Sequence, residues 1–141
     1  MAKIMDKSFF ILNISDDILQ QIKKIIDEKD NCNCDYHISG SSVWFQAESQ
    51  ETELRLLTLG DYSMTISRVA FVNQRCGTMT AILDLLLNYC KTKGIKKFTV
   101  QSVCTPEMAN FCLKHGITPD PHAIMEMDNG FIFGDYCIEI A

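Results

Sequence analysis

The sequence predicts an α+β fold of the α/β/α type, in which helices flank a mixed central sheet of about seven strands. Two observations lead to this prediction. Short segments rich in β-forming residues alternate with three segments of helical apolar spacing, in the order β-α-β-β-β-α-β-α-β-β. A helix separates the fourth and fifth predicted strands, which makes these two strands parallel, whereas the short connections elsewhere favour antiparallel pairs.

The composition indicates one domain over residues 1–141, because 141 residues with 47% apolar content suffice for one well-buried core. A net charge of −5 argues against a nucleic-acid partner, since no basic stripe is present to neutralise phosphates. No segment approaches the roughly 18 apolar residues of a membrane span. The seven scattered cysteines and the lack of a signal-peptide pattern predict reduced thiols and a cytoplasmic location.

The N-terminal half is expected to hold one helix and four strands. The apolar run in Ser8–Ile14 indicates a buried strand, and Ser15 then caps a helix that ends at about Asp30. A polar loop is expected from there to about Gly40. Three further strands, joined by short connections into an antiparallel meander, are predicted at Ser42–Glu48, Glu53–Leu59 and Ser63–Val72.

The C-terminal half is expected to contain two helices, a strand between them and a final hairpin. Gly94 stops the first helix after a basic last turn, and Thr105, followed by a proline, starts the second. The turn Asp128–Gly130 between apolar stretches is a strong hairpin signal. The predicted elements are a helix over Met79–Lys93, a strand over Lys97–Val103, a helix over Pro106–His115, and strands over Ala123–Met127 and Phe131–Ile140.

The polar turn Asn73–Thr80 leads from a strand into a helix. The first N–H groups of a helix lack partners within it and the helix dipole adds positive potential, so such a turn can receive a pyrophosphate. Gly77 would let a ligand approach the backbone closely, and Arg75 could add a cationic contact. The alternative is that Gly77 only serves the tight turn. Neither Gly-x-Gly-x-x-Gly nor Gly-Lys-Ser/Thr occurs, so another nucleotide-type ligand is needed.

The segment Ile66–Thr118 resembles the GCN5-related N-acetyltransferase (GNAT) family. The family motif Gln/Arg-x-x-Gly-x-Gly/Ala appears here as Gln74–Met79, and the helix Met108–His115 precedes Gly116-Ile117 where relatives carry Gly-Phe. The order of elements also matches. The resemblance implies a sheet splayed between its fourth and fifth strands, and direct transfer of an acetyl group from acetyl-CoA to a primary amine. That amine could belong to a small molecule, a polyamine or a protein.

The resemblance also implies which residues hold the cofactor. The backbone of Val69–Val72 would face the acetyl and pantetheine arm, the turn around Gly77 would hold the pyrophosphate, and strand Lys97–Val103 would form the other wall. No metal ligand is implied. The cofactor-binding residues implied in this way are Val69, Phe71, Val72, Gln74, Arg75, Cys76, Gly77, Thr78, Met79, Thr80 and Thr105.

Three residues depart from the family pattern. Met79 replaces a Gly or Ala, Thr105 replaces an Asn that often contacts the cofactor, and Cys112 replaces the Tyr that often protonates the leaving CoA thiolate. A thiol can donate a proton, although it is a short and weak donor. Cys112 is therefore one catalytic candidate, and Tyr136 on the last strand is a second. The alternative to an active enzyme is a GNAT-fold acyl-CoA-binding or protein-interaction module with weakened catalysis.

No general base stands out in the sequence, and the acceptor, the acyl length and the oligomeric state, including a homodimer, stay open. The candidates for a base, each with a plain structural role as its alternative, are Glu107, His115, His122 and Asp135.

For two further groups of residues, a purely structural role is expected more strongly than a functional one. Cys32, Cys34 and His37 lie close together, but no second pair of ligands accompanies them, so a plain loop is expected and not a zinc site. Trp44 and Phe45 could line the acceptor site, with core packing the stronger expectation.

Overall fold

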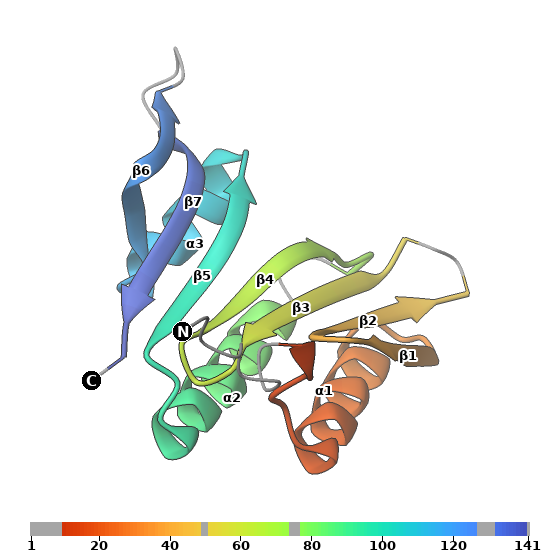
Figure 1. Cartoon of the computed structure of the whole chain (residues 1–141). Helices are drawn as coiled ribbons and strands as arrows, with labels where there is room; N and C mark the ends of the chain where they lie inside the picture. The colour runs from red at the N-terminus through yellow and green to blue at the C-terminus, as the bar shows by residue number, and fades with distance from the viewer. Residues whose placement is uncertain (1–9, 49–50, 74–76, 127–131, 141) are drawn as a thin grey trace, which may run out of the picture.

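The computed structural model describes residues 10–48, 51–73, 77–126 and 132–140. In these ranges seven strands form one mixed sheet flanked by three helices, which confirms the predicted architecture (Figure 1). The sheet order is β1-β2-β3-β4-β5-β7-β6. The strands are β1 Cys34–Ser39, β2 Ser42–Ala47, β3 Glu53–Leu59, β4 Ser63–Ala70, β5 Lys97–Val103, β6 Thr118–Glu126 and β7 Ile132–Glu139, and the helices are α1 Asp16–Lys29, α2 Thr78–Lys93 and α3 Pro106–Lys114.

The centre of the sheet is the parallel pair β4 and β5, which α2 connects as expected. Their pairing covers Ser63–Ile66 of β4 and ends at the pair Ile66–Val100. Beyond that point β4 continues to pair only with β3, after a register shift that leaves Ser67 bulged. The two strands therefore separate toward the C-terminal end of β4, as predicted for this fold.

Two expectations for the N-terminal part are wrong. The described residues of the expected strand Ser8–Ile14, from Phe10 onward, form no strand, and Phe10 and Ile11 are 60% and 61% exposed. The expected loop before Gly40 contains the edge strand β1 instead. This strand buries only Cys34 fully and is held by its antiparallel pairing with β2, so its sequence carries little hydrophobic pattern.

Capping residues set the helix ends where the sequence indicates. The Oγ atom of Ser15 accepts a hydrogen bond from the N–H of Ile18 at 3.4 Å, and Thr105 accepts one from the N–H of Met108 at 3.2 Å. Gly94 ends α2 at φ 81°, in the left-handed region that favours glycine.

The final hairpin differs from the prediction in the length of β6. This strand begins at Thr118 and includes Pro119 and Pro121, residues that lack a backbone N–H and argue against a central strand. It is an edge strand with a register shift after Pro119, and proline is tolerated in both situations. The expected turn Asp128–Gly130 lies outside the described residues.

The three helices pack against the sheet, and the hydrophobic core lies between the helices and the strands. α1 packs beside α2 and against β1, and α3 lies against β5 and β7 (Figure 1). Within the described ranges, no helix is long and apolar enough to cross a membrane. Buried residues that join the helices to the sheet include Leu19, Ile22 and Ile26 of α1, Ile82, Leu83 and Leu86 of α2, and Phe45, Leu54, Leu56, Met64, Ile66 and Phe98 of the strands.

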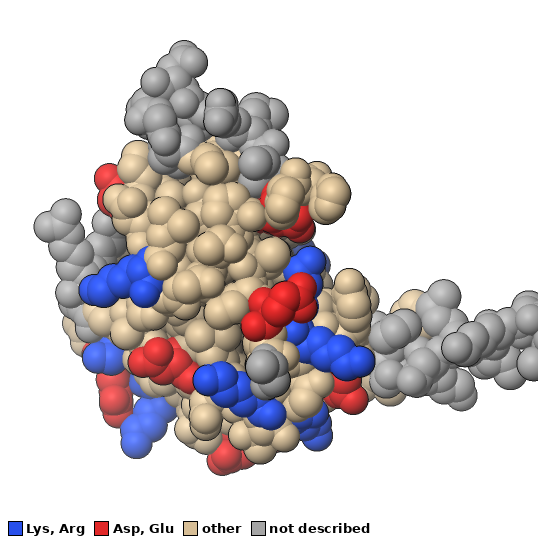
Figure 2. All heavy atoms as spheres, turned by 90° about the vertical axis from the view of Figure 1, so that its left-hand side faces the viewer, with Lys and Arg blue, Asp and Glu red and all other residues tan. Residues whose placement is uncertain are grey.

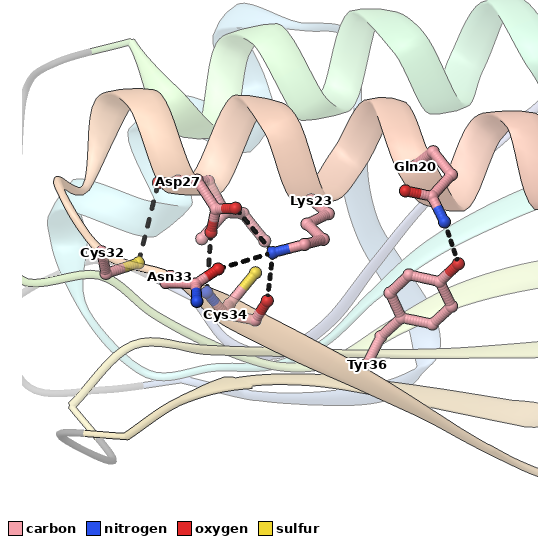
Figure 3. Close-up of polar contacts among 8 residues, drawn as sticks. Gln20, Lys23, Asp27, Cys32, Asn33, Cys34 and Tyr36 are labelled. Carbon is pink, nitrogen blue, oxygen red and sulfur yellow. Dashed lines mark hydrogen bonds and ion pairs between the residues drawn. The ribbon is translucent and has the colours of Figure 1, made fainter.

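A polar cluster fastens the edge strand β1 to α1 (Figure 3). The carboxylate of Asp27 accepts a 2.7 Å hydrogen bond from the N–H of Cys34, and Lys23 pairs with the same carboxylate at 2.7 Å. Lys23 also donates to Asn33 at 3.0 Å. One turn earlier, Gln20 donates to the hydroxyl of Tyr36 at 2.8 Å. These bonds fix the position of α1 and hence of the residues that follow its last turn.

The side of the molecule on which β6 forms the sheet edge carries charges of both signs. Figure 2 shows Lys and Arg mixed with Asp and Glu over its lower part, and mainly uncharged atoms above them. On this view the described residues form no patch of a single sign. The net charge of −5 therefore produces no continuous acidic surface among the described residues on this side of the molecule.

Candidate functional site

A cavity of about 600 Å³ opens at the C-terminal end of β4, between the first turns of α2 and α3. It lies where β4 and β5 no longer pair, so the splay of the sheet and the two helix starts form it together. Most of the described residues that the sequence assigns to cofactor binding line it. These are Val69, Phe71, Gly77, Thr78, Met79, Thr80 and Thr105.

The remaining cofactor candidates are placed differently. Val72 is 51% exposed and lines a neighbouring hollow on the other side of the same loop. Gln74, Arg75 and Cys76 lie outside the described residues. Asn73, the first residue of the predicted turn, also lines the cavity, and the wall includes Met108 and Phe111, which the sequence did not assign to it.

The polar end of the cavity is the N-terminus of α2. Gly77 is the N-cap at φ 78°, with no side-chain capping bond, and the first turn carries no acidic residue. Thr78 is 3% exposed, and its Oγ1 atom has no hydrogen-bond partner among the described groups. Free helix amides beside an unpaired buried hydroxyl form a place where an anion can bind.

Positive charge lies close to this turn. The ammonium of Lys29, at the end of α1, is 4.0 Å from where a Cβ on Gly77 would stand. Among the described residues not adjacent to Gly77, no other atom lies within 4 Å of that point, so the backbone conformation is the reason for a glycine that these residues show. Lys29 could not be predicted from the sequence, because the residue is 48 positions away from Gly77 and reaches it only in the fold.

The opposite part of the cavity is apolar. Val69 and Phe71 from the end of β4 face Met108 and Phe111 from α3, and all four are half-buried. Met79 is half-buried at the same cavity. A ligand with an anionic end and an apolar arm fits such an arrangement better than a wholly charged ligand does.

The two catalytic candidates are both in the core, and neither lines the cavity. Cys112 is fully buried, and burial raises the pKa of its thiol to about 12. Tyr136 is 1% exposed, and its pKa is raised by burial and by the neighbouring Cys112. Its hydroxyl donates to the carbonyl oxygen of Ile132. Their catalytic roles stay predictions.

Of the four candidates for a general base, Glu107 is the one that lines the cavity. The carboxylate of Asp135 accepts a 2.8 Å hydrogen bond from the N–H of Ser102, a residue held at φ 56°. The ring of His115 packs on that of Phe111, with 4.6 Å between centroids.

The fourth candidate, His122, is exposed on the edge strand β6, and its N–H donates to the carboxylate of Asp120 at 3.0 Å.

A second hollow of about 420 Å³ is lined by Val72, the residue between Phe71 and Asn73 of the cavity wall. Its wall combines the loop after α1 with the connection between β2 and β3, and it contains three carboxylates, those of Asp30, Glu48 and Glu51. The sequence did not single out any of the three. Carboxylates of this kind suit a cationic ligand group.

Two groups with competing interpretations, Trp44 with Phe45 and the cysteines near His37, lie as follows. Phe45 is buried in the core as expected, whereas Trp44 is 39% exposed and stacks under the guanidinium of Arg55 at 5.7 Å, so the core expectation for Trp44 is wrong. Cys34 is buried in β1, and burial raises its pKa to about 12. The described residues contain no group of three or more His, Cys, Asp or Glu placed to hold a metal.

Solved structures with the same arrangement are acetyltransferases. The ribosomal-protein-S18-alanine N-acetyltransferase of Escherichia coli matches with a TM-score of 0.53 at 13% identity, over 75% of this chain and 70% of that one. A probable acetyltransferase of the GNAT family from Chromobacterium violaceum ATCC 12472 matches with a TM-score of 0.51 at 11% identity, over 70% of this chain and 59% of that one. The chain has the GNAT fold.

Ard1 from Thermoplasma volcanium extends the likeness over almost the whole chain. It matches with a TM-score of 0.51 at 12% identity, over 91% of this chain and 95% of that one. No family profile matches the sequence, and no curated protein matches it either. At such low identities the likeness establishes the GNAT fold, and the ligand and reaction have to be argued from the residues of this chain.

Proposed function

We propose that the protein is an N-acetyltransferase that transfers an acetyl group from acetyl-CoA directly to a primary amine. The observation that carries the proposal is the buried hydroxyl of Thr78, which has no hydrogen-bond partner among the described residues. It lies at the N-terminus of α2, on the wall of a cavity that is otherwise largely apolar. A GNAT fold with an anion-binding helix start at this cavity supports a CoA-type ligand.

The residues present fit that ligand at both ends. The amides of the first turn of α2, the hydroxyl of Thr78 and the ammonium of Lys29 would hold the diphosphate. The apolar side chains of Val69 and Met108 would contact the acyl arm. Met79, the departure at the family's small-residue position, lines the cavity and leaves about 600 Å³ open.

Acetyl-CoA, when bound, supplies an activated acyl thioester. A protonated amine must lose one proton before its nitrogen can react and a second when it is acylated, while the C–S bond of the thioester breaks and CoA departs as its thiolate or thiol. Glu107 is the one titratable side chain among the described residues of the cavity wall, so it would pass these protons on in turn. Glu107 is exposed, so it can hold each proton at a carboxylate oxygen and release it to water. The apolar side chains around the cavity exclude water from the reacting groups.

The neighbouring hollow supports an amine as the acceptor. Glu48, an exposed carboxylate directly after β2, lines it together with Glu51. A protonated amine gains from carboxylates near its binding site, because unlike charges attract strongly where water is partly excluded. The acceptor class that this surface supports is a primary amine with further positive charge.

A second candidate function is acyl-CoA binding without efficient transfer. The burial of Cys112 and Tyr136 favours it, because neither of these proton donors reaches the cavity wall. Binding and transfer are therefore to be measured separately.

The test begins with calorimetric titration of acetyl-CoA into the wild-type protein and into Gly77→Ala. Gly94→Ala is the matched control, because Gly94 has nearly the same positive φ, 81° against 78°, and no atom within 4 Å of an added Cβ. Both variants are expected to lose similar stability, roughly 1–2 kcal/mol. Only Gly77→Ala is expected to bind acetyl-CoA more weakly.

Lack of any binding by the wild type at millimolar acetyl-CoA would overturn the proposal, because a ligand of the native state must stabilise it. If acetyl-CoA binds, thiol release is followed with polyamines, amino acids and lysine peptides. Release above the rate of spontaneous hydrolysis supports transfer, whereas binding without release leaves the acyl-CoA-binding function.

A further inference from the structure

Asp30 is a charged residue in an unusual place. It is the C-cap of α1 and is only 4% exposed, although a carboxylate at a helix C-terminus meets the negative end of the helix dipole. Burial of an ionised carboxylate is strongly unfavourable unless hydrogen bonds compensate it. The bonds that Asp30 makes therefore indicate what holds it there.

Within the described part of the chain, the side-chain hydrogen bonds of Asp30 connect α1 to distant segments. Its Oδ1 atom accepts a 2.6 Å hydrogen bond from the N–H of Asn73, and its Oδ2 atom accepts a 3.1 Å bond from the N–H of Val72. The hydroxyl of Thr52, at the start of β3, also donates to Oδ2. In addition, the side-chain amide of Asn73 donates to the carbonyl oxygen of Lys29 at 3.3 Å.

These bonds act on the stretch that enters the cofactor turn. Val72 and Asn73 follow β4 directly, and Gly77 begins the first turn of α2 four residues after Asn73. Two consecutive amides bound to the two oxygens of one carboxylate cannot move independently of α1. The stretch is thereby fixed relative to α1, which itself is fastened to β1 by the Lys23–Asp27 cluster.

We propose that Asp30 is a positioning residue for the cofactor site: it holds Val72 and Asn73, which lead toward the N-terminus of α2, in place before the ligand arrives. The inference rests on the proposed function, because it concerns the turn that would hold the diphosphate of acetyl-CoA. A turn ordered in advance loses less conformational freedom on binding, so affinity increases without any direct contact between Asp30 and the ligand.

The charge of Asp30 is compatible with an anion nearby. Its two oxygens are engaged by two amides and a hydroxyl, and the ammonium of Lys29 lies at the turn itself. Asp30 thus organises the backbone, and Lys29 provides the positive charge that the ligand meets. These different roles explain how an acidic residue can lie beside a proposed phosphate site.

The test compares Asp30→Asn with Glu28→Gln, an exposed carboxylate in the same last turn of α1. An asparagine keeps the shape but has one acceptor oxygen, so it can satisfy only one of the two amides. Two quantities are measured: hydrogen exchange of the Val72 and Asn73 amides in the ligand-free protein, and the Kd of acetyl-CoA by calorimetry. Exchange is a readout that does not depend on catalysis.

In Asp30→Asn we expect the two amides to exchange at least about tenfold faster and acetyl-CoA to bind about tenfold more weakly, at a binding stoichiometry of about one. Glu28→Gln is expected to match the wild type in both. A merely structural role would lower Tm but leave the Kd of the folded fraction unchanged, and that result would overturn the inference while the proposed function stands. No binding by the wild type would overturn both.

If Asp30→Asn does not fold, Thr52→Val takes its place. This variant keeps the carboxylate and removes one donor to it, so a smaller change in the same direction is expected, about two- to threefold in Kd. An unchanged Kd and unchanged exchange in Thr52→Val would then count against the inference.

Discussion

The hydroxyl of Tyr136 donates a 2.6 Å hydrogen bond to the carbonyl oxygen of Ile132, within the same strand β7. Tyr136 is buried, so this bond occupies the group that would otherwise serve as a proton donor. We therefore expect Tyr136→Phe to lower the free energy of unfolding by about 1–2 kcal/mol, because a buried carbonyl loses its partner, and to leave kcat within about twofold.

Chemical denaturation and thiol-release assays measure the two quantities for Tyr136→Phe. Tyr62→Phe is the control, since Tyr62 is 57% exposed and should change neither. A kcat reduced a hundredfold in Tyr136→Phe at unchanged Kd would instead establish Tyr136 as a catalytic residue.

Replacement of Thr78 should change stability and ligand affinity in opposite directions. Thr78→Val removes a buried hydroxyl that has no partner among the described groups, so the free energy of unfolding should rise by roughly 1 kcal/mol. Acetyl-CoA should bind about three- to tenfold more weakly, because the ligand loses one donor. Denaturation and calorimetry measure the two effects, with Thr99→Val on β5 as the control. Unchanged affinity would remove Thr78 from the site.

Lys29 should contribute to affinity through its charge. Lys29→Gln is expected to weaken acetyl-CoA binding about three- to tenfold at low salt and to reduce the dependence of Kd on salt, because charge-assisted contacts to phosphate are screened. Lys24→Gln, an exposed lysine on the same helix, serves as the control. Equal losses in both variants would mean that net charge alone, and not the place of Lys29, is responsible.

The thiols should differ widely in reactivity. Cys104 is exposed, whereas Cys34, Cys90 and Cys112 are buried and burial raises the pKa of each to about 12. Iodoacetamide should therefore label Cys104 first and reach the three buried thiols only on unfolding. Mass spectrometry with and without denaturant measures this. Labelling of Cys112 at the rate of Cys104 would show that its thiol reaches solvent and would restore it as a proton donor.

The attachment of β1 to α1 should weaken in acid. Burial acts to raise the pKa of Asp27, but the N–H of Cys34 and the ammonium of Lys23 outweigh it and lower the pKa below its usual 3.8. The stabilisation by Asp27 is therefore complete above about pH 4 and is lost as the pH falls through the lowered pKa. Denaturation from pH 6 to pH 2 should show a flatter acid limb for Asp27→Asn than for wild type. Asp35→Asn, on exposed β1, should leave that limb unchanged.

Local signals in the sequence predicted the helices and the central strands. The caps at Ser15 and Thr105 and the stop at Gly94 act within a few residues, so they can be recognised without the fold. Strand β1 could not be found in this way, because an edge strand with one fully buried residue has almost no hydrophobic period. The run at Phe10–Ile14 misled for another reason: Phe10 and Ile11 are exposed, and the buried Ile14 joins the core without pairing in the sheet.

The part of the candidate site that is continuous in the sequence could be predicted. The residues that reach it from distant segments could not. The turn at Gly77 and the end of β4 carry a recognisable pattern, and the structure brings them to one cavity. Lys29 and Asp30 reach the same turn from more than 40 residues away, and nothing in their neighbours in sequence marks them. Burial of Cys112 and Tyr136 is likewise a property of the packed core.

The four residue pairs that join β4 to β5 are the sole backbone pairing, within the described ranges, between strands β1–β4 and strands β5–β7. Each group has its own antiparallel pairing and its own helix cover, α1 against β1 and α3 against β5 and β7. We therefore expect the two groups of strands to open as two cooperative units, which these few backbone pairs join. A ligand that touches β4 and α3 at once couples these units, so saturation with it should merge two steps of native-state exchange into one.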